Sequence, residues 1–454
     1  MILFNGIFCN RYEYLWDVYK LLELLKFRLT REQKITVFAS WLGWSLDGYD
    51  LVLMLFVISS VNQLFFPTQD PTLSLLATFA TYTVALIMRP LGGALFGSFG
   101  DRHGRKNAMM ITVIGISAIT FLTGLLPTWN TVGIIAPILL ILLRFAQGLF
   151  AGGEWASGSS ITMETTPKST RGLLSGFLQS GYTFGFLMAS IVFQIVSHTY
   201  TGESFVEVGW RLMFYTAIGP GLLSLLIRFK MNESEIWLEK KKLHKIERNP
   251  LLRVLTEKQN RRTLFLALII MTGLMYSYYT SIGFMPTFLQ RYVGLDRQDV
   301  ASIMIAATIS SFIGTVFTGT ISQYIGRMKT LTIFGVAAMI LAVPTVIGIY
   351  QSDSITEKMF FTGVLVFVAS TSFGPIPAFL SERFPTEVRN TASGFAYNGG
   401  LIIGSWSPLV AIHLLSNVNH ELTAYVFAAN IIIGSFIIFV GSKINRETRH
   451  VNIE

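Results

Sequence analysis

Residues 97–106 read GSFGDRHGRK, and residues 319–329 read GTISQYIGRMK. Each segment follows one apolar stretch and precedes another. The second segment repeats glycines and an arginine of the first at a fixed offset of 222 positions (319 minus 97), in the pairs Gly97 and Gly319, Gly104 and Gly326, and Arg105 and Arg327. A loop that recurs at a fixed separation indicates two copies of one structural unit.

A second pair of segments supports the same repeat. Residues 163–177 read METTPKSTRGLLSGF, and residues 380–395 read LSERFPTEVRNTASGF. Their matching positions are all 218 apart (382 minus 164): Glu164 and Glu382, Pro167 and Pro385, Arg171 and Arg389, Ser175 and Ser393, Gly176 and Gly394, and Phe177 and Phe395. Two similar halves in a membrane protein predict a pseudo-two-fold axis along the membrane normal, with a substrate site between the halves.

The composition is that of a multi-span membrane protein. Of the 454 residues 52% are hydrophobic and only 13% are charged, with a mean hydropathy of +0.54, whereas soluble domains carry about 25% charged residues. The single cysteine, Cys9, excludes an internal disulfide and a multi-cysteine metal site. We expect no metal and no cofactor. Residues 1–35 predict an amphipathic segment on the cytoplasmic surface, because they lack a signal-peptide cleavage site.

Twelve apolar stretches are long enough to cross a bilayer, which takes about 20 residues each. The predicted fold is therefore all-α, with six helices in residues 36–228, a basic linker in 229–263, six helices in 264–442 and a tail in 443–454. The predicted spans are 36–60, 73–98, 107–127, 132–157, 172–197 and 210–228, then 264–289, 299–322, 330–350, 359–381, 391–415 and 422–442.

The lysines and arginines predict the orientation. With both termini in the cytoplasm, 29 of the 35 fall in cytoplasmic segments, as the positive-inside rule requires. The net charge of +9 is then a topology signal, and no nucleic-acid partner is expected. We expect a multi-pass protein of the plasma membrane, in contact with lipid and monomeric.

These features resemble the major facilitator superfamily, whose loop signature is similar to GSFGDRHGRK. The first half is similar to the metabolite:proton symporter family in four stretches: QLFFPTQDPTLSLLATFATY at 63–82, RPLGGALFGSFGDRHGRK at 89–106, APILLILLRFAQGLFAGGEW at 136–155, and GWR at 209–211. LDGYD at 46–50 is more similar to sialate:proton symporters, and its GYD to sugar porters. Gln323 stands where the loop signature has aspartate.

Two carboxylates, Asp47 and Asp50, lie in the middle of the first span, on one helix face. An ionisable group at that depth costs about 2.5–3.5 kcal/mol on insertion scales, so it is a candidate for function. We expect the pair to carry protons, with Asp50 the better single candidate because it occupies the place of the sugar-porter aspartate. The alternative is that one of them caps a helix break at Gly48.

Two arginines, Arg89 and Arg144, lie inside predicted helices. Arg144 is expected near Asp47 and Asp50, either in a salt bridge to Asp50 that opens on protonation, or holding a substrate carboxylate; a fixed structural pair is the alternative. The resemblance links its R-x-x-x-G pattern to proton coupling. Arg89 is a candidate for binding an anionic substrate, because guanidinium pairs with carboxylate through two hydrogen bonds. A structural pair with Glu154 is its alternative.

A set of charged residues is expected at cytoplasmic helix ends. The resemblance implies that they pair across helices while the cytoplasmic side is closed and separate when it opens. The candidates are Asp101, Arg102, Arg105, Glu154, Glu164 and Arg171, mirrored by Glu382 and Arg389. Because Gln323 replaces an aspartate, we expect the second copy to be weaker.

The remaining candidates are polar and aromatic residues inside apolar runs, which line a cavity or pack between helices: Tyr49, Gln147, Gln179, Tyr182, Tyr276, Tyr279, Asn398 and Trp406. Together these residues predict a proton-coupled importer of a small organic anion such as a carboxylate or an acidic sugar. The alternatives are a symporter of a neutral sugar or zwitterion, in which acidic residues already occupy both arginines, and a non-transporting nutrient receptor. An enzyme is not expected, since no catalytic motif is present.

Overall fold

The computed structural model describes residues 29–243, 249–451 and 453. Most of the predicted amphipathic segment, and Cys9, lie outside these ranges. The described residues contain helices and turns but no strand, and twelve helices are long and apolar enough to span a membrane. The prediction of an all-α fold with twelve spans is confirmed.

Six spans form the first set. They are α2 (Arg31–Phe65), α3 (Pro71–His103), α4 (Arg105–Gly124), α6 (Ile135–Thr165), η1 with α7 (Lys168–Thr170, Arg171–Thr199), and η2 with α8 and α9 (Phe205–Gly209, Trp210–Tyr215, Ile218–Phe229). A short helix, α5 (Trp129–Val132), precedes α6. The connector to the second set carries α10 (Glu235–Lys242) and α11 (Pro250–Thr256).

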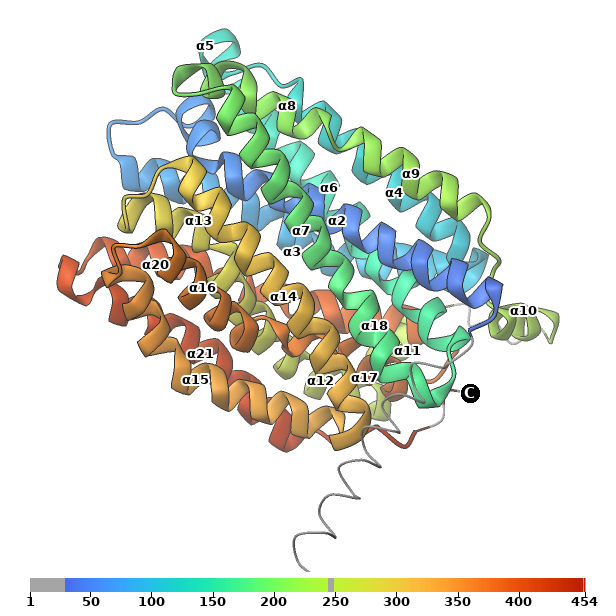
Figure 1. The fold of residues 1–454 in the computed structure, drawn as a ribbon. Helices are drawn as coiled ribbons and strands as arrows, with labels where there is room; N and C mark the ends of the chain where they lie inside the picture. The colour runs from blue at the N-terminus through green and yellow to red at the C-terminus, as the bar shows by residue number, and fades with distance from the viewer. Residues whose placement is uncertain (1–28, 244–248, 452, 454) are drawn as a thin grey trace, which may run out of the picture.

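The second set has six further spans. They are α12 to η4 (Lys258–Tyr278, with η3 Tyr279–Gly283, α13 Met285–Thr287 and η4 Phe288–Tyr292), α14 (Arg297–Ile325), α15 (Arg327–Gln351), α16 to α17 (Ile355–Ala369, with η5 Thr371–Phe373 and α17 Ile376–Arg383), α18 to α20 (Arg389–Gly399, Leu401–Gly404, Ser407–Ser416), and η6 with α21 (His420–Leu422, Thr423–Ile444). Figure 1 shows the blue-to-green helices of the first set beside the yellow-to-red helices of the second.

The two sets meet along two seams, where α7 packs on α14 and α3 packs on α18. Glycine allows the closest approach. A Cβ added to Gly176 of α7 would lie 2.8 Å from the carbonyl oxygen of Thr315 and 3.0 Å from Cα of Gly319 in α14. Both sets of helices contribute side chains to a cavity described below.

The repeated loops turn on glycines that have a left-handed backbone. Gly104 is the only residue between α3 and α4, and Gly326 is the only residue between α14 and α15. Their φ values are +105° and +106°, which L side chains rarely adopt. The repeated motif therefore places the same one-residue turn in both sets.

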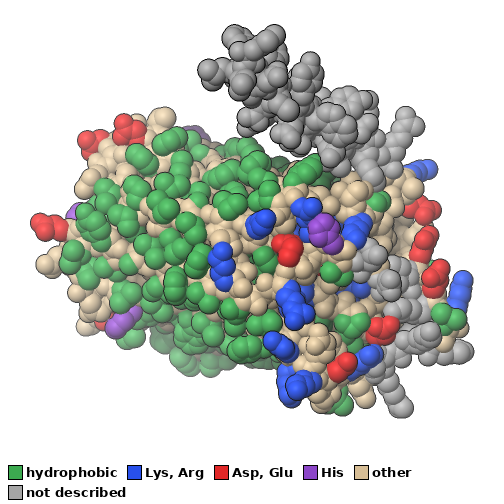
Figure 2. All heavy atoms as spheres, turned by 90° about the horizontal axis from the view of Figure 1, so that it is seen from below, with side chains coloured by type: hydrophobic (Ala, Val, Ile, Leu, Met, Phe, Trp, Pro, Cys, Tyr) green, Lys and Arg blue, Asp and Glu red, His purple; other side chains and the backbone are tan. Residues whose placement is uncertain are grey.

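The basic residues gather at one end of the bundle. We call it the basic end; it carries Arg31, Arg102, Arg105, Lys106, Lys168, Arg171, Arg327, Lys329, Arg383, Arg389, Lys443, Arg446 and Arg449. Figure 2 shows Lys and Arg side chains concentrated toward one side of the face it draws, with apolar side chains over much of the rest. The opposite end carries loops 66–70, 125–134, 200–204, 293–296, 352–354 and 417–419.

Candidate functional site

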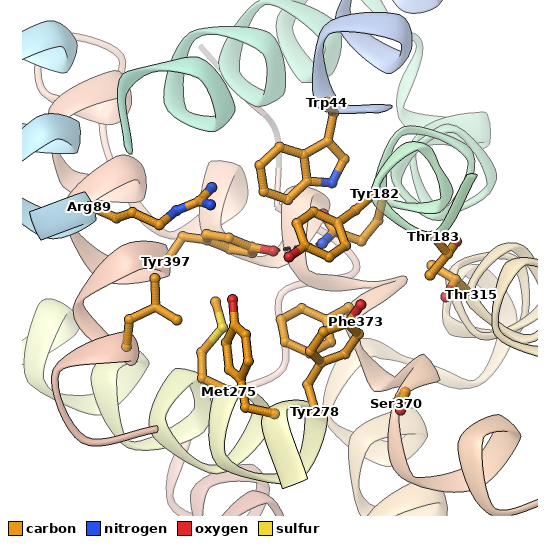
Figure 3. A pocket seen from close by; sticks show the side chains of 13 residues that line it. Trp44, Arg89, Tyr182, Thr183, Met275, Tyr278, Thr315, Ser370, Phe373 and Tyr397 are labelled. Carbon is orange, nitrogen blue, oxygen red and sulfur yellow. Dashed lines mark hydrogen bonds between the residues drawn. The ribbon is translucent and has the colours of Figure 1, made fainter. Parts of the chain in front are cut away.

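A small cavity lies between the two sets of helices, and the centre of a water-sized sphere can occupy about 30 Å³ of it. Six of its thirteen lining residues are aromatic. The first set contributes side chains from α2, α3 and α7, and the second set from α12, η3, α14, η5, α18 and α19. The lining residues are Trp44, Arg89, Gln179, Tyr182, Thr183, Met275, Tyr278, Tyr279, Thr315, Ser370, Phe373, Tyr397 and Leu401. Figure 3 shows Trp44, Tyr182, Tyr278, Phe373 and Tyr397 around one space, with Arg89 at its side.

The charged group in this wall is Arg89, and it already has a carboxylate partner. Its two terminal nitrogens donate to Asp47, at 2.5 Å to Oδ2 and 3.3 Å to Oδ1, and its Nε donates to Oδ1 of Asn398 at 3.2 Å. Asn398 belongs to the second set of helices, so the contact ties α3 to α18. Arg89 also lies over the ring of Trp44, with Cζ 5.6 Å from the ring centre. The cavity wall is therefore close to neutral in charge.

Asp50 lies outside the cavity lining, in a separate buried network within the first set. It accepts hydrogen bonds from the hydroxyl of Thr120 on α4 and from the side-chain amide of Gln147 on α6. Gln147 in turn accepts a hydrogen bond from Arg144 at 2.5 Å, and Arg144 also donates to Oγ1 of Thr123 at 3.3 Å. The expected direct salt bridge between Asp50 and Arg144 is absent, because the amide of Gln147 lies between them.

The expected alternative pairing of Glu154 with Arg89 is not found. Glu154 binds Arg228 of α9 through both carboxylate oxygens and accepts a hydrogen bond from Thr112 of α4 at 2.8 Å, so it is not the partner of Arg89. These partners all belong to the first set of helices. The sequence interpretation missed Arg228 because it lies at a helix end, where a basic residue is ordinary. Gly43 of α2 packs on this pair, and a Cβ there would collide with it.

The cavity contains only part of the predicted lining set. The members that line it are Arg89, Gln179, Tyr182 and Tyr279. Asn398 is not in the lining but accepts a hydrogen bond from Arg89, which is. Tyr49 instead bonds Thr216, Gln147 bonds Asp50, and Tyr276 donates to Asn430 at 2.5 Å, so none of these lines the cavity. Trp406 is 48% exposed on the outer surface of the bundle, and the prediction that it lines the cavity is wrong.

Aromatic contacts join the two sets of helices on the sides of the cavity that face each end of the bundle. Toward the basic end, Tyr397 stacks on Trp155 with ring centres 3.8 Å apart, and Gln179 donates to the Tyr397 hydroxyl at 2.7 Å. Toward the opposite end, Tyr82 meets Tyr279 with ring centres 6.3 Å apart. Each contact joins one set of helices to the other at the wall of the cavity.

The mirrored charged residues meet at the basic end. Glu164 binds Arg105 of its own set at 2.7 Å and Arg389 of the other set at 3.0 Å. Glu382 binds Arg327 of its own set at 3.1 Å and Arg171 of the other set at 3.5 Å. We call these six residues the latch; each of its glutamates joins the two sets of helices.

The neighbouring residues extend the latch. Asp101 accepts hydrogen bonds from the backbone and hydroxyl of Thr391 at 3.1 Å and 2.6 Å, which adds a third link between the sets. Gln323, in the mirrored position, accepts a hydrogen bond from the backbone of Gly172 at 2.8 Å. Arg102 takes no part in these links; it is exposed and bonds Asn249 at 3.2 Å.

Two further glutamates repeat the symmetry outside the spans. Glu233 accepts a hydrogen bond from the backbone of Lys106 at the start of α4, and Glu447 accepts from Arg327 and Met328 at the start of α15. Burial alone would raise the pKa of Glu447, but backbone N–H groups bonded to its carboxylate hold that pKa below its usual value. Glu447 is therefore charged at neutral pH and caps the N-terminus of α15, next to the latch residue Arg327.

Comparison with known proteins places the chain in a family. Residues 35–408 match the model of the Major Facilitator Superfamily. The chain belongs to the Major Facilitator Superfamily. It is 31% identical over 408 residues to the glycine betaine/proline/ectoine/pipecolic acid transporter OusA of Dickeya dadantii, covering 87% of this chain and 80% of that protein. It is also 31% identical over 421 residues to the inner membrane metabolite transport protein YhjE of Escherichia coli, covering 91% and 94%.

A further relative and a solved structure are also similar to the chain. The proline/betaine transporter of Escherichia coli is 30% identical over 409 residues, covering 87% of this chain and 81% of that protein. Among solved structures, the proton:xylose symporter XylE bound to a bromo-deoxyglucose superposes with a TM-score of 0.73 at 18% identity, covering 92% of this chain and 96% of that one. The chain is a multi-pass membrane transporter of this superfamily.

Proposed function

We propose that this chain imports a small zwitterion together with protons, by alternating access of the central cavity to the two sides of the membrane. The organic anion expected first is not supported. Asp47 already neutralises Arg89 in the cavity wall, and Arg144 lies outside the lining. Several relatives are named as transporters of proline and betaine. The neutral-sugar or zwitterion alternative is the better supported one, with Arg89 paired to Asp47 and Arg144 bonded to Gln147 and Thr123.

The aromatic wall suits the cationic part of a zwitterion. Ring faces attract ammonium groups, and quaternary ammonium is bound in proteins by cages of such rings. Trp44 lies 5.1 Å from Tyr182 and 5.8 Å from Tyr397 between ring centres, and Tyr278 lies 5.7 Å from Tyr182 and 5.6 Å from Phe373. A cationic group enclosed by these five rings would meet several aromatic faces. The neutral wall is the observation that carries the proposal.

The carboxylate of the zwitterion has donors available beside the rings. A guanidinium has five N–H groups, and the bonds to Asp47 and Asn398 use three of those on Arg89. Trp44 Nε1 and the hydroxyl of Tyr278 are buried and have no hydrogen-bond partner in the part of the chain that the structure describes. A carboxylate between Arg89 and these groups would satisfy polar atoms that are costly to bury alone.

The proton sites lie next to this cavity. Asp50 is fully buried one helical turn from Asp47 and is the proposed proton carrier, with Asp47 and Arg144 as its charged neighbours. The latch would separate when the basic end opens. We place that end in the cytoplasm by the positive-inside rule. We further propose that the protein is a monomer of the plasma membrane, with lipid on its apolar flanks.

Uptake into proteoliposomes tests the substrate class. Labelled proline and glycine betaine are expected to exchange across the membrane, and unlabelled zwitterions should compete with them better than succinate, lactate or xylose. If a carboxylate anion or the sugar competes best, the proposal of a zwitterion is wrong.

The variant Asp50→Asn tests the proton carrier. Asparagine resembles protonated aspartate, so we expect the variant to exchange labelled proline for unlabelled proline but to lose accumulation driven by a pH gradient. Asp70→Asn, at the cap of α3 on the opposite end, is the matched control and should accumulate substrate normally. Gradient-driven accumulation by Asp50→Asn as steep as that of the unchanged protein would rule out this role.

A further inference from the structure

The contacts around Asp50 give Gln147 a specific place in the buried network. Asp50 and Arg144 are both fully buried, and neither has an ion-pair partner of opposite charge within the described ranges. The Gln147 amide nitrogen donates to Asp50, and its oxygen accepts from Arg144. A neutral side chain therefore links a buried acid to a buried base.

This arrangement is unusual for buried charges, which are normally paired directly or through several hydrogen bonds. Arg144 is otherwise held by Thr123 and lies over the ring of Phe214, with Cζ 5.5 Å from the ring centre, while its Nε has no partner in the described chain. Gln147 lies one turn from Arg144 on α6, so the two are held at a fixed spacing. The amide of Gln147 thus occupies a contact position on both the acid and the base.

We propose that Gln147 is a positioning residue that keeps Arg144 from pairing directly with Asp50 and so leaves Asp50 able to take up and release a proton. The inference rests on the proposed function, in which Asp50 carries the proton. A guanidinium in direct contact would hold Asp50 in its charged form, because an opposite charge within about 4–6 Å strongly favours ionisation. With the amide between them, the charged form is stabilised less.

Other charged and polar groups also face Asp50 and contribute to its electrostatic environment. On α2 itself Asp47 and Tyr49 face it, and Asp47 is bound to Arg89 of α3. From α6 it faces Arg144 and Gln147, and from α4 the hydroxyl of Thr120, which does not titrate in this range. Of these, Gln147 is the neutral group in contact with both Asp50 and Arg144, so changing it alters their separation directly.

Two substitutions are expected to move the pH dependence of uptake in opposite directions. Gln147→Ala opens the path, so Arg144 can contact Asp50, and half-maximal uptake should shift to more acidic pH by about one unit or more. Gln147→Glu keeps the shape but places a carboxylate against Asp50 and neutralises Arg144, so the shift should be to more alkaline pH by about one unit or more.

The measurement is the initial rate of proline uptake into proteoliposomes across external pH, compared by the pH of half-maximal rate and not by the maximal rate. Gln194→Ala on α7, a part-buried glutamine away from this network, is the matched control and should keep the unchanged profile. The competing role for Gln147 is only to donate a hydrogen bond to Asp50. In that case Gln147→Ala should shift half-maximal uptake to more alkaline pH, because the charged form of Asp50 loses a donor.

The outcomes separate the two proposals. Opposite shifts support the spacing role. An alkaline or absent shift in Gln147→Ala, or an absent or acidic shift in Gln147→Glu, overturns it while the unchanged protein still shows pH-driven uptake. If the unchanged protein shows no pH-driven uptake, it is the proposed function that fails. Should the alanine variant not fold, Gln147→Ser, which also shortens the side chain and opens the path, takes its place.

Discussion

Arg89→Ala is expected to reduce zwitterion uptake by more than about a hundredfold through lost substrate binding. It also lowers the stability of the fold, since removing one member of a buried ion pair costs about 3–5 kcal/mol. The change leaves Asp47 charged and unpaired at the cavity, and it removes the bond to Asn398 that joins α3 to α18. It also removes the guanidinium donors proposed for the substrate carboxylate. The measurement is the rate of labelled proline uptake into proteoliposomes at fixed protein density.

Two variants separate a binding role from a folding role. Asp47→Asn with Arg89→Gln removes both charges together, so the fold should be recovered, as judged by a single symmetric peak in gel filtration, without recovery of uptake. Arg102→Ala changes an exposed arginine at the basic end and should transport normally. Uptake by the double variant at the unchanged rate would show that Arg89 has no part in substrate binding.

Gly176→Leu is expected to abolish transport by preventing closure of the basic end. Gly176 faces backbone atoms of α14, and a Cβ would lie 2.8 Å from the Thr315 carbonyl oxygen. Real Cβ atoms essentially never come so close, and backbone cannot swing aside as a side chain can. The seam between α7 and α14 would therefore be held apart.

Labelling from the basic side detects this state. In a Cys9→Ser background, a cysteine introduced at Thr183 in the cavity wall should react faster with a membrane-impermeant maleimide when Gly176→Leu is present. Gly219→Leu on α9 is the matched control, since a Cβ there meets nothing within 4 Å. Unchanged reactivity together with normal uptake would contradict the assignment of this seam as a closing contact.

The spans and the paired helix-end charges could be predicted because each depends on a short stretch of sequence. Apolar length decides a span, and an offset of 218 places Glu164 and Glu382, and Arg171 and Arg389, at equivalent points of two similar units. The partner of each buried charge could not be predicted in this way. Asp47 and Asp50 share a helix face, yet the first binds Arg89 on α3 while the second binds Gln147 on α6.

The difference lies in helix rotation. A turn of a few tens of degrees of α3 or α6 about its own axis changes which carboxylate an arginine reaches, and packing of neighbouring helices sets that rotation. For the same reason Trp406 points outward, whereas Tyr278 and Tyr397, which no motif marks, point into the cavity. With 13% aromatic residues, the chain offers too many candidates for composition to select among them.

The most direct test of the account is the charge moved in each transport cycle. A zwitterion carries no net charge, so its import with protons moves positive charge inward, and each elementary charge contributes about 2.3 kcal/mol per 100 mV of membrane potential. Proteoliposomes adsorbed on a capacitive electrode should therefore give an inward positive current when proline or glycine betaine is added, and Asp50→Asn should give no sustained current. A carboxylate anion that accumulates on a pH gradient without any current, while the zwitterions produce none, would contradict proton-coupled import of a zwitterion.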